Sequence, residues 1–229
     1  NCVLMARNET TLQEALKQLD ISNNQQHNYL IADFSKPHEV KDAIEAYTKD
    51  HDIHIVINNT GGPKAGPIVE AEEEAFRIAF NQHVICNQII TKAVIPAMKK
   101  AGYGRIINII STSVKIPLHN LGVSNTIRGA VASWAKTMAN ELGQFNITVN
   151  NILPGMTKTN RLNSLIAHNA SLNEITVEEV TNHMHAEIPM KRFGEASEIA
   201  AVIAFLASPA ASYVNGISIP VDGGRTGSI

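Results

Sequence analysis

The chain has 229 residues, of which 44% are hydrophobic and 17% are charged. These values are typical of an ordinary globular α/β domain that can bury a full core. A formal net charge of −2 argues against nucleic acid or an anionic membrane as the main partner. No apolar run approaches the ~20 residues that a membrane-spanning helix needs. Cys2 and Cys86 are the only cysteines and lack metal-ligand or disulfide spacing, so we expect a reduced, cytoplasmic setting.

Strands and helices alternate along the chain, which predicts a parallel sheet covered on both faces, a three-layer doubly wound α/β fold. Residues 1–6 read as a strand already in progress, and a polar helix is expected over 11–19, where Thr11 and Glu14 have capping-box spacing. No Gly-rich phosphate turn occurs anywhere. We therefore expect one domain, 1–229, that is N-terminally incomplete: a first strand, its Gly-rich turn and a first helix are missing from this sequence.

The later elements continue the alternation. Strands are predicted over 28–32, 53–57, 105–110, 146–151 and 216–221, and helices over 35–49, 70–100, 122–142, 176–187 and 195–207. Ser35 is the expected N-cap of its helix, and Pro96 should kink the long helix or end its regular part. The segment 154–175 is rich in Asn, Thr and Ser with weak periodicity, so we interpret it as a mobile substrate lid.

Several motifs occur in a characteristic order. Asn58-Asn-Thr-Gly61 follows one strand, Gly104-Arg-Ile-Ile-Asn-Ile-Ile-Ser111 forms another, and Asn150-Asn-Ile-Leu-Pro154-Gly155 ends a third. With the C-terminal stretches 188–194 and 220–224, they resemble the short-chain dehydrogenase/reductase family over nearly the whole chain, in particular its 3-oxoacyl-carrier-protein-reductase-like branch. The resemblance implies a Rossmann-like fold and hydride transfer between a nicotinamide cofactor and a carbonyl or secondary alcohol.

The resemblance also implies which residues hold the dinucleotide. Asp33 and the backbone N–H of Phe34 would hold adenine, and Thr157 and Thr159 fall where the family holds the nicotinamide amide. The remaining positions that match the family's cofactor-binding loops are Asn59, Gly61, Pro154 and Gly155. In the Asn-Asn-x-Gly motif the amides are expected to tie the sheet together, while the glycine lets the backbone approach a ribose.

The cofactor preference rests on Ala6-Arg7-Asn8, at the end of the first visible strand. Family members that use NAD usually place Asp there, where it accepts hydrogen bonds from the ribose 2′-hydroxyl. An Arg can instead pair bidentately with a 2′-phosphate. The sequence therefore favours NADP(H) over NAD(H); the alternative is that Arg7 is simply solvated.

The family's catalytic tetrad is Asn, Ser, Tyr and Lys, and only the Ser is retained. Ser111 matches the Ser that polarises the substrate carbonyl, His83 stands at the Asn, Ser124 at the Tyr and Arg128 at the Lys. Ser124 and Arg128 are one helical turn apart and should share a face. A Ser hydroxyl is far less acidic than Tyr, and an Arg with a pKa above ~12 does not relay protons. Arg128 can still hold ribose hydroxyls, so we expect an intact cofactor half and a broken proton-transfer half.

His83 is the candidate for the missing donor, because an unperturbed pKa of ~6.5 suits that role, acting through a water. The alternative is a His bonded to backbone between helix and sheet. Lys115 and His119 lie in the loop after Ser111, where they contact substrate or are merely solvated. Tyr103 is too distant, at the other end of the strand, and no metal site is expected.

Two functions remain open. The first is an NADP(H)-dependent oxidoreductase in which Ser111 orients the carbonyl and Arg128 the nicotinamide ribose. The second is a catalytically inactive nucleotide-binding sensor or assembly protein of the same fold, motivated by Ser124 and Arg128. The resemblance implies a homotetramer, with a dimer as fallback, and Ala130, Ala132, Ala135 and Ala139 have spacings that permit close helix packing.

Overall fold

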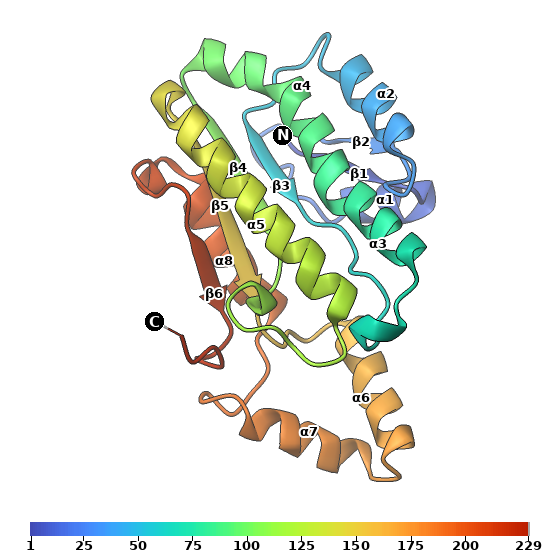
Figure 1. Ribbon diagram of the computed structural model, residues 1–229. Coiled ribbons are helices and arrows are strands. Elements are labelled where there is room, and N and C mark those ends of the chain that lie inside the picture. Colours follow the sequence, from blue (N-terminus) through green and yellow to red (C-terminus); the bar gives the residue numbers. More distant parts are fainter. Residues whose placement is uncertain (229) are drawn as a thin grey trace.

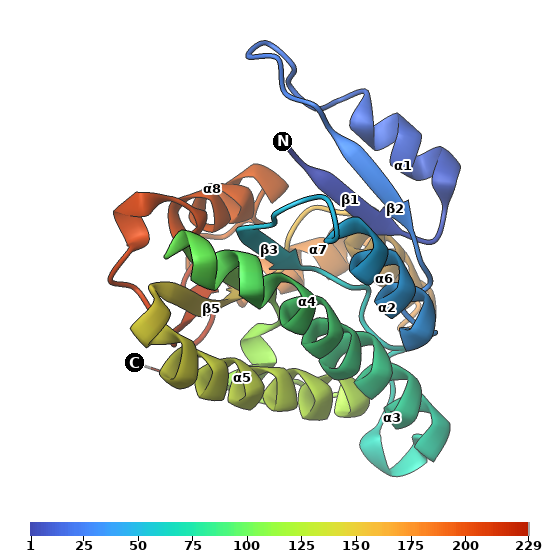
Figure 2. The ribbon, with the colours of Figure 1, turned by 90° about the horizontal axis from the view of Figure 1, so that it is seen from above.

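The computed structural model describes residues 1–228 and contains six parallel strands in two sheets (Figure 1). The strands are β1 (Val3–Ala6), β2 (Asn28–Ile31), β3 (Ile55–Asn58), β4 (Gly104–Ile109), β5 (Ile147–Pro154) and β6 (Ser218–Val221). β1 pairs with β2, while β3, β4, β5 and β6 pair in that order. Within residues 1–228, no strand pairing joins β1 to β3, although both ribbon views place β1 and β2 on the side of β3 away from β5 (Figures 1 and 2).

Helices cover the strands from both sides, which confirms the predicted three-layer α/β fold. They are α1 (Glu9–Leu16), α2 (Pro37–Tyr47), α3 (Glu73–Phe80), α4 (Cys86–Ala101), α5 (Gly122–Leu142), α6 (Asn160–Leu172), α7 (Val177–Ala186) and α8 (Ala196–Ala207). Seen from above, α2, α4 and α5 lie on one side of the strands, and α1 and α8 on the other (Figure 2). Within residues 1–228, no helix is both long and apolar enough to cross a membrane.

The main core lies between the sheet and α2, α4 and α5. Its buried members come from every one of these elements, among them Val40, Ile44, Ile90, Val94, Met98, Ile106, Ala135 and Val149. Ala135 and Ala139 are 1% and 2% exposed. The prediction that these two alanines contribute to packing between subunits is therefore wrong, because they already pack inside this chain.

A row of buried amides joins the four strands of the larger sheet. Asn58 Nδ2 donates to Asn108 Oδ1 at 2.8 Å, Asn108 Nδ2 donates to Asn151 Oδ1 at 2.9 Å, and Asn151 Nδ2 donates to the Ser218 hydroxyl at 3.1 Å. These residues are direct partners in the strand register. The expectation that the Asn-Asn-Thr-Gly motif ties the sheet together is confirmed for its first Asn.

The segment that was predicted to be a mobile lid is mostly helical. α6 begins after Thr159, whose side chain accepts the backbone N–H of Leu162 at 3.3 Å and caps the helix. One face of α6 (Leu162, Ile166, Ala170) packs with Val180 and Met184 of α7. This apolar row follows i, i+4, i+8 spacing. It was not recognised from the sequence because the segment is rich in polar residues. α6 and α7 lie together at one end of the molecule (Figure 1).

Two predicted helix starts are also wrong. α1 is capped by Asn8, whose side chain accepts the N–H of Thr11 at 3.0 Å, so Thr11 lies inside the helix and is not its cap. Ser35 uses its backbone N–H and hydroxyl to bind the carboxylate of Asp33, and the N-cap of α2 is Lys36. At α1 a neighbouring Asx side chain binds the free N–H group, and before α2 Asp33 binds Ser35 itself, so that Ser35 does not cap the helix.

The long helical region neither ends nor breaks at Pro96. Its helices α3 and α4 are joined by a π-helical turn over Asn81–Ile85, and α4 continues through Pro96 to Ala101. Proline removes the hydrogen bond to the carbonyl of Lys92, four residues earlier. Lys92 and Pro96 are both exposed, so water can satisfy that carbonyl.

Candidate active site

The predicted site residues follow the carboxyl ends of parallel strands. β3 ends at Asn58, β4 at Ile109 and β5 at Pro154, and the three strands are adjacent. In open α/β sheets, ligands bind outside this edge. Residues predicted from different parts of the sequence therefore lie at one edge of the four-stranded sheet.

Arg128 lies at the centre of this edge. Its side chain donates from Nη1 to the carbonyl of Ile109 at 2.9 Å and from Nη2 to the carbonyl of Thr60 at 3.4 Å, so it links the ends of β4 and β3. Arg128 is 8% exposed, and burial together with the charge of Arg161 lowers its pKa to about 10. At neutral pH it remains a cation, as the sequence predicted.

His83 lies below Arg128 in the π-helical turn and is 1% exposed. Its Nδ1 shares a hydrogen bond with the hydroxyl of Thr60, and its Nε2 has no partner within residues 1–228. Burial, followed by the charge of Arg128, lowers the pKa of His83 to about 3. The imidazole is therefore neutral at any ordinary working pH. The prediction that His83 titrates near 6.5 is therefore wrong, and the lowered pKa argues against His83 as the proton donor.

Ser111 follows β4, and Ser124 lies on α5. The Ser111 hydroxyl caps a short 3₁₀ turn by accepting the N–H of Ser113 at 3.1 Å. A hydroxyl that accepts one bond still has its proton to donate, so Ser111 can polarise a carbonyl oxygen. Ser124 is buried on α5 one turn before Arg128, as their spacing predicts. Tyr103 instead donates to the carbonyl of Ala207 at 2.7 Å.

The edge past β3 is open where a cofactor was predicted. Asn59 and Gly61 are exposed, and a Cβ built on Gly61 would meet no atom within 4 Å. The absence of a side chain at Gly61 thus leaves room for a ligand against the backbone. Lys115 and His119, in the loop after β4, are also exposed.

The residues after β5 make mainly local contacts. A Cβ on Gly155 would lie 2.6 Å from the Cα of Asp222, so glycine is needed there for packing on the chain after β6. Thr157 donates its hydroxyl proton to the carbonyl of Gly155 at 3.1 Å, and Thr159 caps α6. Pro154, the last residue of β5, brings this segment to the same edge.

Arg7 and Asp33 follow the two strands of the smaller sheet. The Asp33 carboxylate accepts both the N–H (2.9 Å) and the hydroxyl (2.8 Å) of Ser35, and these bonds, with a smaller contribution from the charge of Arg7, lower its pKa. Arg7 itself is exposed. Phe34 packs partly buried against the main core, and its carbonyl accepts the Cys86 thiol at 3.3 Å. Asp33 is therefore ionised and close to a cation that can reach solvent.

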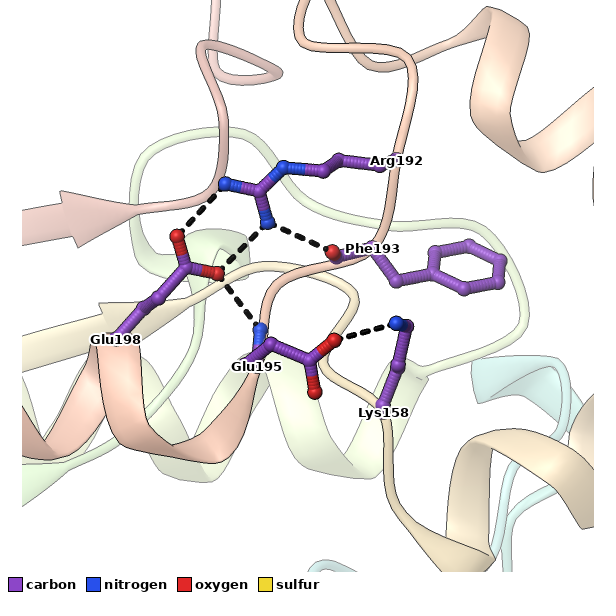
Figure 3. Close-up of polar contacts among 5 residues, drawn as sticks. All are labelled: Lys158, Arg192, Phe193, Glu195 and Glu198. Atoms are coloured by element: carbon purple, nitrogen blue, oxygen red, sulfur yellow. Dashed lines mark hydrogen bonds and ion pairs between the residues drawn. The ribbon is translucent and has the colours of Figure 1, made fainter.

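A polar cluster holds the chain after β5 against the start of α8 (Figure 3). Lys158 pairs with Glu195, and Arg192 makes a two-pronged ion pair with Glu198, with both distances at 2.7 Å. Glu198 also accepts the backbone N–H of Glu195 at 2.8 Å. The Arg192 bonds are the main reason why the pKa of Glu198 falls to about 2. Sequence reasoning missed this cluster.

Two residues of the edge were also missed. Arg161 of α6 reaches across to the carbonyls of Gly62 and Pro63, each at 3.4 Å. Thr60 binds both His83 and Arg128. The only sequence signal for Thr60 was that it stands where the Asn-Asn-x-Gly motif of the resembled family has Ala, and Arg161 gave no signal.

Comparisons with known proteins agree with this geometry. A family model described as "Enoyl-(Acyl carrier protein) reductase" matches residues 1–226. The NADPH-dependent reductase BacG of Bacillus subtilis is 33% identical over 177 residues, which are 77% of this chain and 68% of that protein. The 3-oxoacyl-[acyl-carrier-protein] reductase FabG of Pseudomonas aeruginosa is 33% identical over 172 residues, 74% of this chain and 64% of that protein. The structure of L-sorbose reductase from Gluconobacter frateurii, complexed with NADPH and L-sorbose, has a TM-score of 0.91 at 27% identity and covers 99% of this chain and 87% of that one.

Proposed function

The chain belongs to the short-chain dehydrogenase/reductase family, and from this premise we propose that it is an NADPH-dependent reductase of a carbonyl substrate. The observation that carries the proposal is the position of Arg128 beside the open edge at Gly61. Arg128 spends two of its five N–H donors on backbone carbonyls. The remaining N–H groups are available to hold the hydroxyls of a nicotinamide ribose.

NADPH is preferred over NADH because of Arg7 at the end of β1. A guanidinium forms strong charge-assisted bonds with a phosphate, and Arg7 is exposed. Several relatives support this preference, since the similar proteins from B. subtilis and G. frateurii are described with NADPH. Asp33, Phe34, Asn59 and Gly61 would line the path of the adenine half, and Pro154, Gly155, Thr157 and Thr159 that of the nicotinamide half.

The catalytic work of the side chains is limited to binding and polarisation. Bound NADPH supplies hydride. Ser111 donates its proton in a hydrogen bond to the substrate carbonyl, and the fixed charge of Arg128 stabilises negative charge that develops on the oxygen. Ser124, Arg128 and the neutral His83 are poor acids, so the proton that the oxygen finally gains comes from water.

A fluorescence titration of the protein with NADPH and then NADH tests this proposal. We expect micromolar NADPH binding and weaker NADH binding. Arg7→Gln should weaken NADPH about 10- to 100-fold, as expected for a lost charge-assisted pair of ~1.5–3 kcal/mol, and leave NADH unchanged. If neither nucleotide binds, the oxidoreductase proposal is wrong. Carbonyl substrates are then screened by NADPH consumption.

The second candidate, nucleotide binding without turnover, is favoured by one observation. Arg128 is tied to the carbonyls of Ile109 and Thr60, and burial keeps His83 neutral. The double variant Ser124→Tyr, Arg128→Lys restores the family's residues. An inactive protein should gain NADPH turnover in this variant, whereas an enzyme that uses water should lose activity or show no gain.

A homotetramer is supported by apolar groups beside α8 and β6. Phe205, Tyr213 and Ile217 are 47%, 102% and 39% exposed, and apolar side chains of this size commonly mark an interface. A dimer is the alternative, and sedimentation distinguishes the two.

The cysteines are unpaired within residues 1–228, which supports the proposal of a reducing cytoplasmic setting.

A further inference from the structure

Four of the basic side chains close to the carboxyl edge of the larger sheet make contacts of two different kinds. Lys158 and Arg192 are each paired with a glutamate (Figure 3). Arg128 and Arg161 take part in none of the ion pairs within residues 1–228, and each donates only to backbone carbonyls. Of these four, only the second pair has charge that no carboxylate of the protein neutralises.

The two guanidinium groups bind the same short loop from two different helices. Arg128, on α5, donates to the carbonyl of Thr60, and Arg161, on α6, donates to the carbonyl of Gly62. These carbonyls are two residues apart, a chain length of at most about 7 Å. A Cβ on Gly62 would lie 2.8 Å from Nη1 of Arg161, so the absence of a side chain at 62 admits the guanidinium.

Placing these cations together has an energetic cost that the protein alone does not offset. The charge of Arg161 contributes to lowering the pKa of Arg128, after the larger effect of burial. Arg128 is buried whereas Arg161 is exposed, and a buried cation normally has a carboxylate partner. An anion held by charge-assisted bonds to Arg161 would lie close to Arg128 and would balance its charge.

We propose that Arg161 is the main contact in a binding site for an anionic group of the substrate, a carboxylate or a phosphate, to which Arg128 contributes its charge while its free N–H groups hold the nicotinamide ribose. The inference rests on the proposed reductase function, and it narrows the substrate to carbonyl compounds that carry a negative charge. We assign selection of the substrate to Arg161. It is the member of the pair that lies on α6, which follows the end of β5 and contacts α7. The cofactor's 2′-phosphate is assigned elsewhere, to Arg7 at the end of β1.

The test compares anions with a neutral analogue by calorimetry, using the full-length protein with and without saturating NADP⁺. Tartrate and threitol share one carbon skeleton and differ in two carboxylates, and pyruvate and inorganic phosphate serve as further anions. We expect at least one anion to bind the unchanged protein at least 10-fold more tightly than threitol. Arg161→Gln should remove at least 10-fold of that affinity and leave NADPH binding within 2-fold.

Lys158→Gln is the matched control, because it removes the same charge from a nearby cation that already has a partner. Anion binding within 2-fold of the unchanged protein in this variant supports the proposal. If Arg161→Gln and Lys158→Gln lose anion affinity equally, the effect is due to general charge and the proposal is wrong. The proposal is also wrong if no anion binds more tightly than threitol. If Arg161→Gln weakens NADPH itself, the anion is a cofactor phosphate and the substrate assignment is wrong. Failure of NADPH to bind the unchanged protein would refute the reductase proposal separately, since anion binding is also measured without nucleotide.

Discussion

The neutral, buried state of His83 predicts how the stability of the protein depends on pH. The pKa of His83 falls from an ordinary 6.5 to about 3 in the folded chain. Between these values the unfolded chain binds a proton that the native protein does not, so the free energy of unfolding rises with pH. The stabilisation is complete above pH 6.5, and it is lost progressively as the pH falls towards 3.

The size of the effect follows from the same two values. Each pH unit below 6.5 costs about 1.4 kcal/mol, so between pH 7 and pH 5 His83 alone removes about 2 kcal/mol. His83→Asn has no titrating group at this position. At pH 7 we expect the variant to be less stable by about 1–3 kcal/mol, because the bond to Thr60 is lost or weakened. At pH 5 that difference should shrink by about 2 kcal/mol.

Urea unfolding at pH 7, 6 and 5 measures both free energies under identical conditions. His38→Asn, which changes an exposed histidine of α2, is the control and should keep the pH dependence of the unchanged protein. Carboxylates that titrate near pH 5 are common to all three proteins and cancel in the differences. If His83→Asn and the unchanged protein lose stability in parallel down to pH 5, His83 is not neutral in the native state and the reasoning fails.

Three further substitutions test the scaffold of the site. Asn108→Ala removes one hydrogen bond from each of two buried amide neighbours, Asn58 and Asn151, so urea unfolding should show a loss of about 3–6 kcal/mol; a loss below 1 kcal/mol would contradict the amide row. Gly122→Ala places a Cβ 2.6 Å from the Cα of Ile68, and an unchanged melting temperature would show that this contact yields easily. Thr60→Val removes the hydroxyl that bonds His83 but keeps the carbonyl that accepts from Arg128, so the free energy of unfolding should fall by about 1–3 kcal/mol while the NADPH titration curve stays unchanged; a marked loss of NADPH binding would show that the hydroxyl also positions Arg128.

Much of the fold could be predicted because its signals are local and repeated. The helix 122–142 is confirmed to the residue, and the β-branched runs give the strands to within a few residues. α6 was missed because its apolar row, Leu162, Ile166 and Ala170, is diluted by Asn and Ser and has meaning only against α7. The π-helical turn at 81–85 carries no distinctive composition, so no periodicity argument could have placed His83 within it.

The candidate site divides in the same way. The spacing of Ser124 and Arg128 predicts a shared helix face because both lie on one regular element. Which groups bind Arg128 could not be predicted, since its partners are backbone carbonyls from two other strand ends. The same limit applies to Arg161, whose contact with Gly62 spans 99 residues of sequence. A cationic side chain that lacks a carboxylate partner can be recognised only when all of its neighbours have been placed in the structure.

The altered tetrad has the properties of a site kept under selection more than those of a site that lost its function by random mutation. Random loss at a buried position leaves cavities or unpaired groups, which destabilise the fold. Here Thr60 connects two of the changed positions: its carbonyl accepts from Arg128, and its hydroxyl bonds His83. The charge of Arg128 in turn helps to keep His83 neutral, so the edge holds a fixed cation above an uncharged imidazole. The single unsatisfied atom of this group, Nε2 of His83, is a polar atom that a bound water can satisfy. That internal consistency favours selection for a cation at Arg128 and hence for a bound anion or ribose, whether or not a proton is transferred there.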